Sequence, residues 1–306
     1  MHRAKLWLRR YGRPLELARW EFLFEGGSPE NVLRYLAAFQ NDDGGFGHGL
    51  EPDFWLPDSS PMATWTAGQI LTEIKASHSE PIVERLLKYL IKTPQVQPGM
   101  WPSVQPENNQ HPHAPWWHWN EGAQQGWMFN PSVELAAFLI RWSPAESAEA
   151  RLGWESLKHA LRRVMQTESM DRHELNNYRK SLRLLSHHRE RFSAQMEYTS
   201  EEVQAKVHDL TRRVIDKDVS NWGKGYKPLP LDFIQSPNDP LYPELKELVD
   251  ENLQFYLEQR DDDGIWNITW NWGRYPEEFA VAGRYWQGIL AVERYSILKA
   301  FGREAL

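Results

Sequence analysis

The chain has 306 residues, of which 35 are Lys or Arg and 42 are Asp or Glu, and its formal net charge is −7. This acidic balance disfavours sequence-independent nucleic-acid binding and charge-driven docking on anionic lipid, because both need a basic surface. The chain has no cysteine, which excludes disulfides, thiolate metal sites and cysteine nucleophiles.

The start of the chain lacks the apolar core of a signal peptide, and no apolar run long enough to cross a bilayer occurs. We therefore expect no transmembrane segment and a cytoplasmic location. A hydrophobic share of 41% is sufficient for a buried core, and the 16 Trp residues are the unusual feature of the composition.

Apolar residues recur at spacings of three and four along most of the chain, which is typical of amphipathic helices. Ser28-Pro29, Ser60-Pro61 and Asn130-Pro131 are helix start signals, with proline at the first helical position. No run of alternating apolar and polar residues predicts a strand, so the fold class is all-α. We expect helices over residues 3–24, 28–44, 60–76, 80–92, 130–139, 146–167, 170–187, 200–214, 240–258 and 277–301.

Two connections between these helices are long, residues 93–128 and 218–239. Long loops inside a compact domain are usually functional or disordered. Disordered segments are poor in aromatic residues, whereas the first connection holds a dense group of Trp and His. We therefore expect ordered loops with a functional role.

Two stretches of the sequence match each other, residues 35–46 and 255–266. Each has an aromatic residue and Leu near a helix end, then Gln, a run of Asp, Gly and an aromatic residue. The pattern predicts a helix C-terminus closed by a glycine-bearing turn, with the last aromatic side chain tucked back against the helix. Weaker fragments of the pattern are Gly99-Met100-Trp101 and Asn221-Trp222-Gly223.

When the two strong copies are aligned through Gln40 and Gln259, they lie 219 residues apart. A helical hairpin with its loops needs about 40–50 residues, so about six hairpins fit in the whole chain. Six hairpins arranged head to tail close into a ring. We therefore predict a single domain over residues 1–306, an α/α toroid with inner and outer helices around a central cavity.

The Gln–Asp–Gly–aromatic turn resembles the repeat of squalene–hopene cyclases and is similar to the turn of protein prenyltransferase β-subunits. Residues 42–53 and the closing turn at 263–266 resemble single-domain bacterial proteins with prenyltransferase/squalene-oxidase repeats. This resemblance implies the α/α toroid and an isoprenoid or similar apolar chain as substrate.

The chemistry of those enzymes does not transfer residue by residue. The cyclases protonate their substrate with an Asp-x-Asp-Asp motif, which this chain lacks, because Arg260 precedes the run from Asp261 to Asp263. The cyclases also use a second helical domain, for which no room is left. Protein prenyltransferases hold zinc with an Asp, a Cys and a His, and this chain has no Cys. The cofactor is therefore left open.

The segment from residue 42 to residue 53 carries five titratable side chains among twelve residues. Its glycines allow close approach of the backbone to a ligand, and carboxyl groups buried together shift one another's pKa values, as an acid–base pair requires. One interpretation is a general acid with a second, orienting carboxylate, and the other is a set of turn and capping carboxylates. The candidate catalytic residues are Asp42, Asp43, His48, Glu51 and Asp53, and Phe46 and Trp55 are candidates for substrate binding.

The second candidate is the aromatic loop from His111 to Trp119. Its three histidines are of a type that binds zinc, but their spacing is not a known helical ligand pattern, and a packed loop is the competing interpretation. Its aromatic side chains suit an apolar pocket, a carbocation or the flat face of a sugar. The candidates for substrate binding are His113, Trp116, Trp117 and Trp119.

The third candidate follows the acidic run Asp261–Asp263 near the end of the chain. In a closed ring this turn would neighbour the turn at Asp42, so both acidic runs would border one cavity mouth. The candidates for substrate binding here are Trp266, Trp270, Trp272 and Glu278.

Three functions compete on this sequence. The first is acid catalysis on an isoprenoid or other apolar chain in an aromatic-lined cavity. The second is a carbohydrate-active toroid, a glycosidase or lyase with Trp platforms and paired carboxylates. The third is a binding protein that kept the scaffold without catalysis. In each case we expect a small-molecule partner, an isoprenoid or a saccharide. The oligomeric state is left open.

Overall fold

The computed structural model describes residues 1–303, and within this range the chain is all-α, as predicted. It holds no β-strand there, only isolated bridges between single residues. None of the helices in this range is both long and apolar enough to cross a bilayer. The helices are α1 (His2–Tyr11), α2 (Pro14–Glu25), α3 (Pro29–Leu36), α4 (Pro61–Glu73), α5 (Pro81–Lys92), α6 (Ala123–Trp127), α7 (Ser132–Trp142), α8 (Ala148–Gln166), α9 (Arg172–Leu184), α10 (Arg189–Gln195), α11 (Ser200–Val214), α12 (Tyr242–Glu258) and α13 (Pro276–Ala300).

The chain divides into two compact units. The middle unit is Ala37–Val214, and the terminal unit combines Met1–Leu36 with Ile215–Leu306. Each unit is described by itself below. A single domain over 1–306 and the closure of a toroid stay predictions.

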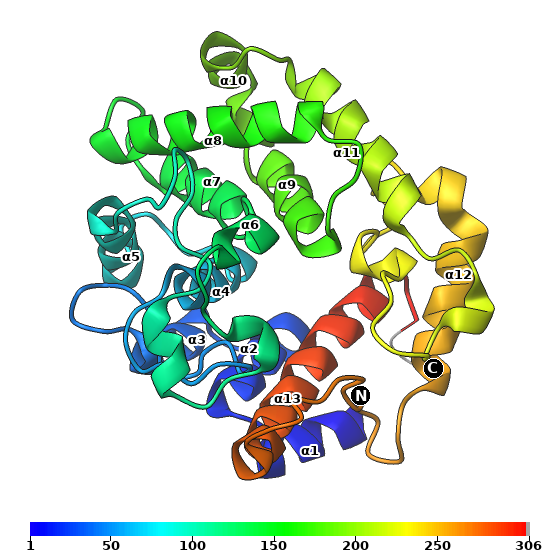
Figure 1. Cartoon of the computed structure of the whole chain (residues 1–306). Helices are drawn as coiled ribbons and strands as arrows, with labels where there is room; N and C mark the ends of the chain where they lie inside the picture. Colours follow the sequence, from blue (N-terminus) through cyan, green and yellow to red (C-terminus); the bar gives the residue numbers. More distant parts are fainter. Residues whose placement is uncertain (304–306) are drawn as a thin grey trace. The chain divides into compact units, whose positions relative to one another are not determined.

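The middle unit has two layers of helices (Figure 1). In one layer α7 packs against α4 and α9, and in the other α8 packs against α5 and α11. The layers meet chiefly through α7 and α8. Because α7 is surrounded, nearly all of its side chains are buried, which fits its almost continuous apolar sequence. Helices that alternate between layers are the arrangement that successive helical hairpins produce.

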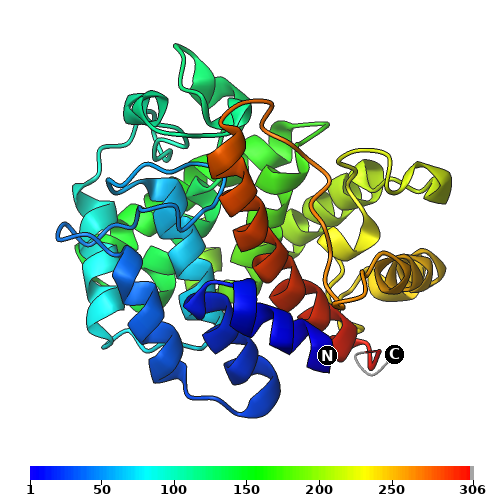
Figure 2. The same cartoon turned by 90° about the horizontal axis from the view of Figure 1, so that it is seen from below.

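The terminal unit joins the two ends of the chain. Its α2 packs against α1, α3 and α13, and Figure 2 shows α1 and α13 side by side. The ring of Tyr295 on α13 lies 5.1 Å from Trp20 on α2 and 5.2 Å from Trp266, measured between ring centroids. Lys299 Nζ also donates a hydrogen bond of 2.7 Å to the Leu23 carbonyl. The first and last helices of the chain therefore share one core.

Helix boundaries differ from the expectation at two places. The predicted helix over 3–24 is two helices, because Pro14 lacks an N–H and restricts Arg13 to an extended conformation with φ −67° and ψ 149°. The predicted helix over 28–44 ends at Leu36 and continues only as a short 3₁₀ turn, Ala37–Phe39. The short helices α6 and α10 were not expected, since each is too brief to show a clear period.

The glycine-bearing turn occurs in three places with the same backbone pattern. In each, an N–H at the start of the turn donates 2.9 Å to the carbonyl four residues on: Asn41 to Gly45, Val96 to Met100, and Asp261 to Ile265. The third residue after the donor is always a glycine in the left-handed region: Gly44, Gly99 and Gly264, with φ of 96°, 80° and 79°. The fragment at Gly99 therefore shares the backbone turn of the two strong copies. The turns also correct the alignment, because Asn41 and Asp261 are equivalent, so Gln40 and Gln259 are not.

The aromatic residue two positions after each glycine is buried, and in two of the three turns it bonds back to the preceding helix, as predicted. Phe46, Trp101 and Trp266 are all fully buried. Trp101 Nε1 donates 2.9 Å to the Leu90 carbonyl of α5, and Trp266 Nε1 donates 2.7 Å to the Tyr256 carbonyl of α12. The last carbonyls of a helix lack partners within the helix, so the indole supplies one of the missing donors.

We predict that Gly44→Ala lowers the free energy of unfolding by about 3 kcal/mol or more, because a left-handed conformation and overpacking each cost about 1–3 kcal/mol. A Cβ at Gly44, where φ is 96°, would lie 2.2 Å from the Arg85 carbonyl oxygen. The matched control is Gly26→Ala, where φ is 71° and no atom lies within 4 Å. Urea denaturation of both variants should give a clearly smaller loss for Gly26→Ala, and equal losses would contradict the steric argument.

Candidate functional site

The first three candidate catalytic residues lie at or beside the first glycine-bearing turn. Asp42 and Asp43 are exposed, and Asp43 Oδ1 accepts hydrogen bonds from the Gly45 N–H at 2.9 Å and from Ser59 Oγ at 2.6 Å. His48 is also exposed, and its Nε2 lies 2.8 Å from Asn41 Oδ1. Asp43 and His48 thus hold the turn together, which matches the capping interpretation of this segment.

Glu51 and Asp53 are buried, unlike the residues of the turn itself. Glu51 Oε2 accepts a hydrogen bond of 2.7 Å from the Asp53 N–H. Charged side chains are rarely buried without polar partners, since their desolvation is costly. Glu51 and Asp53 are therefore the strongest catalytic candidates in the first segment.

The segment at Asp53 pairs with the aromatic loop. The Ala114 N–H donates 2.7 Å to the Asp53 carbonyl, and the Trp55 N–H donates 2.9 Å to the Pro112 carbonyl. Phe54 and His113 form an antiparallel bridge between these two bonds. Two regions that the sequence singled out separately therefore form one structure inside the middle unit.

His113 lies at the centre of the aromatic loop and is 1% exposed. Its Nδ1 is 2.6 Å from the His111 carbonyl oxygen, and its Nε2 is 3.0 Å from His118 Nδ1. Both ring nitrogens of His113 thus have partners within the loop. Within residues 1–303 no group of three His, Asp or Glu side chains is arranged to hold a metal ion. The rings of His113 and His118 stack on each other, with centroids 5.3 Å apart.

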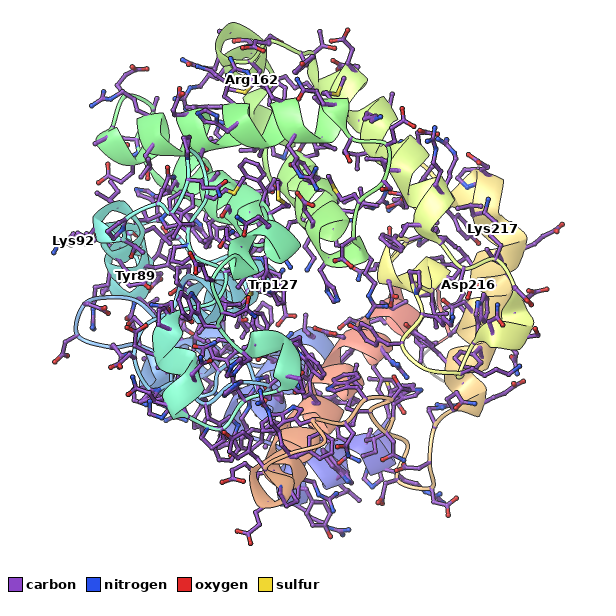
Figure 3. The ribbon with its side chains drawn as sticks, viewed as in Figure 1. Tyr89, Lys92, Trp127, Arg162, Asp216 and Lys217 are labelled. Carbon is purple, nitrogen blue, oxygen red and sulfur yellow. The ribbon has the colours of Figure 1, made fainter. Side chains whose placement is uncertain are left out.

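The tryptophans of this loop divide into a buried and an exposed set. Trp117 is buried, and its ring stacks on that of Trp127, labelled in Figure 3, with centroids 4.4 Å apart. Trp116 and Trp119 are 40% and 36% exposed. Asn109 holds the backbone of Trp119 through two hydrogen bonds, one of 2.9 Å to its carbonyl and one of 2.8 Å from its N–H. The loop therefore presents indole rings to solvent on a fixed backbone.

The remaining candidates for substrate binding have packing partners. Trp55 is half-buried and donates from Nε1 to the Pro52 carbonyl at 3.1 Å. In the terminal unit Trp272 is buried, and the Trp270 ring lies 5.3 Å from that of Trp286. Glu278 is half-buried in the first turn of α13. Because Asp42 and the run Asp261–Asp263 belong to different units, their shared cavity mouth stays a prediction.

A polar cluster on α4, α7 and α9 was missed from the sequence. Glu134, 2% exposed, accepts hydrogen bonds through Oε2 from Trp65 Nε1 at 2.7 Å and from Gln69 Nε2 at 2.9 Å. Lys180 Nζ on α9 lies 5.7 Å from the Trp65 ring centroid, within cation–π range. The signal available in the sequence was Glu134 itself, a charged residue within an apolar helical run.

A second polar group links α9 to α8 and to the residues just before α7. Asn177 Nδ2 donates 2.8 Å both to Asn130 Oδ1 and to the His173 carbonyl. Glu174 pairs with Arg163 at 3.2 Å, and burial raises the pKa of the Glu174 carboxyl while Arg163 opposes that shift. Glu134 and Glu174 both lie in the first turn of a helix, where the helix dipole favours a carboxylate.

We predict that Glu134→Ala lowers the free energy of unfolding by about 3 kcal/mol, because hydrogen bonds to a charged acceptor contribute about 1.5–3 kcal/mol each. Glu134→Gln is the matched control, since it keeps the volume and one oxygen acceptor for Trp65 and Gln69, and we expect a loss of about 1 kcal/mol. Urea denaturation measures both. A wild-type stability for Glu134→Ala would show that the cluster is not structural.

We also predict that His173 titrates far below an ordinary histidine. Although His173 is exposed on the first turn of α9, desolvation by the surrounding protein and the charge of Arg172 lower the pKa of His173 to about 4. The unfolded chain, with a pKa near 6.5, binds more protons between these values, so the contribution of His173 to stability falls as pH decreases through that window.

An NMR titration of the imidazole signals, assigned with His173→Gln, measures this pKa. Arg172→Gln should raise the pKa partway toward its ordinary value, because it removes a repulsive charge but not the desolvation. Titration of His173 near 6.5 in the folded protein would contradict the prediction.

Comparison with known proteins gives no relative from which to transfer a function. No family model matches the chain, no curated protein matches it, and no solved structure matches it. The functional argument therefore rests on the residues described above.

Proposed function

We propose that the chain is a carbohydrate-active protein, which binds a hydroxyl-rich small molecule on the neighbouring helices α4, α7 and α9 and acts on it by acid–base chemistry. The observation that carries this proposal is the Glu134 cluster, in which a buried carboxylate, an indole N–H, an amide and an ammonium group lie together on three neighbouring helices. A cavity for an isoprenoid needs apolar walls, whereas these helix faces offer hydrogen-bonding groups.

Saccharides are recognised through two kinds of contact. Their hydroxyls need paired donors and acceptors, and the half-buried side chains of Gln69 and Lys180 beside Glu134 are the groups proposed to supply them. Their C–H faces pack on flat aromatic rings, and the exposed rings of Trp116 and Trp119 suit that role. The backbone bonds from Asn109 support this assignment, because a fixed aromatic platform loses little conformational entropy on binding.

The proposed acid–base groups are Glu51 and Asp53. They are the buried members of the predicted catalytic set, and they lie on the segment that leads into α4. Burial favours the protonated form of a carboxyl and hydrogen bonds from N–H groups favour the ionised form, so two neighbouring carboxyls with different partners can serve as acid and base. The exposed pair Asp42 and Asp43 is assigned to the turn instead.

A second candidate function is acid catalysis on an isoprenoid chain. It is favoured by the three glycine-bearing turns, which resemble the repeat of squalene–hopene cyclases, together with the sealing aromatic residues. In that case Asp53 is the proposed acid. The third candidate is a binding protein without catalysis. Unlike the two enzymes, it would bind its ligand without needing the buried carboxylates.

The test is a screen of oligosaccharides and polyprenyl diphosphates for binding and turnover, with folding checked by circular dichroism. We expect saccharide conversion, and we expect Asp53→Asn and Glu51→Gln each to reduce the rate by about 100-fold or more, as loss of an acid–base group does. Asp42→Asn is the matched control, and its activity should equal that of the wild type, because Asp42 is exposed on the turn.

The other outcomes separate the three candidates. Conversion of polyprenyl substrates alone would overturn the proposal in favour of the isoprenoid function. If the wild type binds a saccharide without converting it, and Asp53→Asn binds that saccharide equally well, the binding protein is favoured. Folded protein that neither binds nor converts any saccharide would contradict the proposal.

A further inference from the structure

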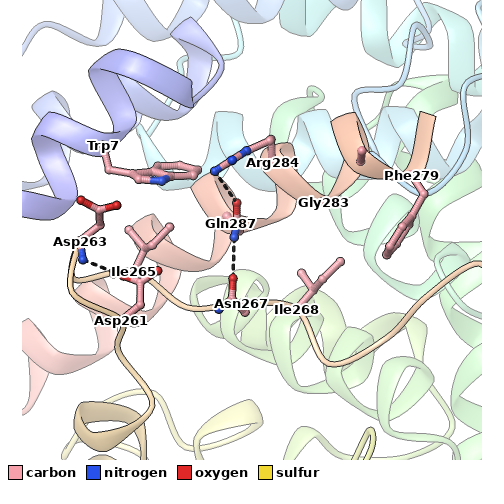
Figure 4. Close-up of a pocket in the computed structure, with 11 residues that line it drawn as sticks. Trp7, Asp261, Asp263, Ile265, Asn267, Ile268, Phe279, Gly283, Arg284 and Gln287 are labelled. Carbon is pink, nitrogen blue, oxygen red and sulfur yellow. Dashed lines mark hydrogen bonds between the residues drawn. The ribbon is translucent and has the colours of Figure 1, made fainter. Parts of the chain in front are cut away.

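The terminal unit contains a pocket that none of the arguments above uses. It has a volume of about 420 Å³ and lies where α1, the glycine-bearing turn at Asp261–Ile265 and α13 meet (Figure 4). This volume is in the range of small-molecule sites in proteins, about 300–1,000 Å³. The pocket lies wholly within the terminal unit.

One side of this pocket is apolar. Trp7 and Ile265 are buried beneath it, and Ile268 and Phe279 are half-buried at its wall. Gly283 on α13 leaves the space open, since a Cβ built there would meet only Ile268 Cδ1, at 3.6 Å. The pocket therefore offers a hollow for an aliphatic group of modest size.

The rim of the pocket carries two opposite charges that do not neutralise each other. Asp263 and Arg284 are both exposed, and neither forms an ion pair with a side chain in residues 1–303. The carboxylate of Asp261 is engaged by the turn, because its Oδ1 accepts hydrogen bonds from the Asp263 and Ile265 N–H groups at 3.0 and 3.1 Å. The carboxylate of Asp263 has no such partner in the described chain.

Arg284 is held in position by its surroundings. Its guanidinium carbon lies 5.8 Å from the Trp7 ring centroid and 5.2 Å from that of Tyr11. Its Nη1 is 3.4 Å from Gln287 Oε1, and Gln287 Nε2 donates 2.7 Å to Asn267 Oδ1, as Figure 4 shows. A guanidinium has five N–H donors, so contacts with aromatic rings and one bond to Gln287 leave further donors for a carboxylate.

We propose that this pocket binds a free α-amino acid with an aliphatic side chain. The ligand carboxylate would pair with Arg284 in the two-bond geometry that guanidinium favours, and its ammonium group with Asp263. Its side chain would fill the hollow beside Gly283. A zwitterion is the ligand class that satisfies both rim charges at once, and this site is independent of the saccharide function proposed for the middle unit.

The test is calorimetric titration of the full chain with L-leucine, alongside isopentylamine, which lacks the carboxylate, and 4-methylpentanoate, which lacks the ammonium group. We expect leucine to bind and both analogues to bind at least about 10-fold more weakly, a free-energy difference of about 1.4 kcal/mol. Arg284→Gln and Asp263→Asn should each weaken leucine binding by a similar factor. Asp262→Asn is the matched control, because Asp262 is an exposed neighbour outside this pocket, and it should leave the affinity unchanged.

Gly283→Leu separates loss of binding from loss of folding. A leucine within α13 has a higher helix propensity than glycine, so the variant should be at least as stable as the wild type, while its side chain occupies the hollow and abolishes binding. If the wild type binds no leucine at a concentration of about 10 mM, the proposal is overturned. Equal affinity for 4-methylpentanoate, or leucine binding that persists in Gly283→Leu, would also overturn it.

Discussion

The structure depends on finding hydrogen-bond donors for the last carbonyl groups of its helices. The last carbonyls of a helix have no partner within it, and a chain that reverses direction must supply one or expose them to water. In this protein a glycine with positive φ turns the chain, and the aromatic residue that follows returns to the helix it has just left. Trp101 and Trp266 complete the closure by donating their indole N–H to a carbonyl of the preceding helix. Part of the high tryptophan content therefore has a structural cause.

The same turn has different consequences in the two units. In the middle unit the carboxylate of Asp43 is used within the turn by Gly45 and Ser59, so it caps rather than reacts. In the terminal unit Asp261 takes that role, and Asp263 is left at the rim of the pocket. One backbone motif thus recurs in both units, while the side chains around its glycine decide whether an acidic group remains for a ligand.

The candidate site of the middle unit combines buried charge with helix ends. Glu134 and Glu174 lie in the first turns of α7 and α9, where free N–H groups and the helix dipole offset part of the desolvation of a carboxylate. Neighbouring indole, amide and guanidinium donors offset more of it. Packing of α4, α7 and α9 brings these polar side chains together. Because the resulting cluster is polar, we favour a hydroxyl-rich ligand over an isoprenoid.

The all-α class, the positions of most helices and the closing turns followed from local rules, because helical periodicity, proline at helix starts and glycine at helix ends act within a few residues. The burial of Glu51 and Asp53 did not follow, since it depends on the pairing of their segment with residues 112–114, about sixty positions away. The partnership of Trp65, Gln69 and Glu134 required α4 and α7 to pack side by side. Local sequence determines which element forms, and only tertiary packing determines which polar side chains from distant elements lose water together and must satisfy one another.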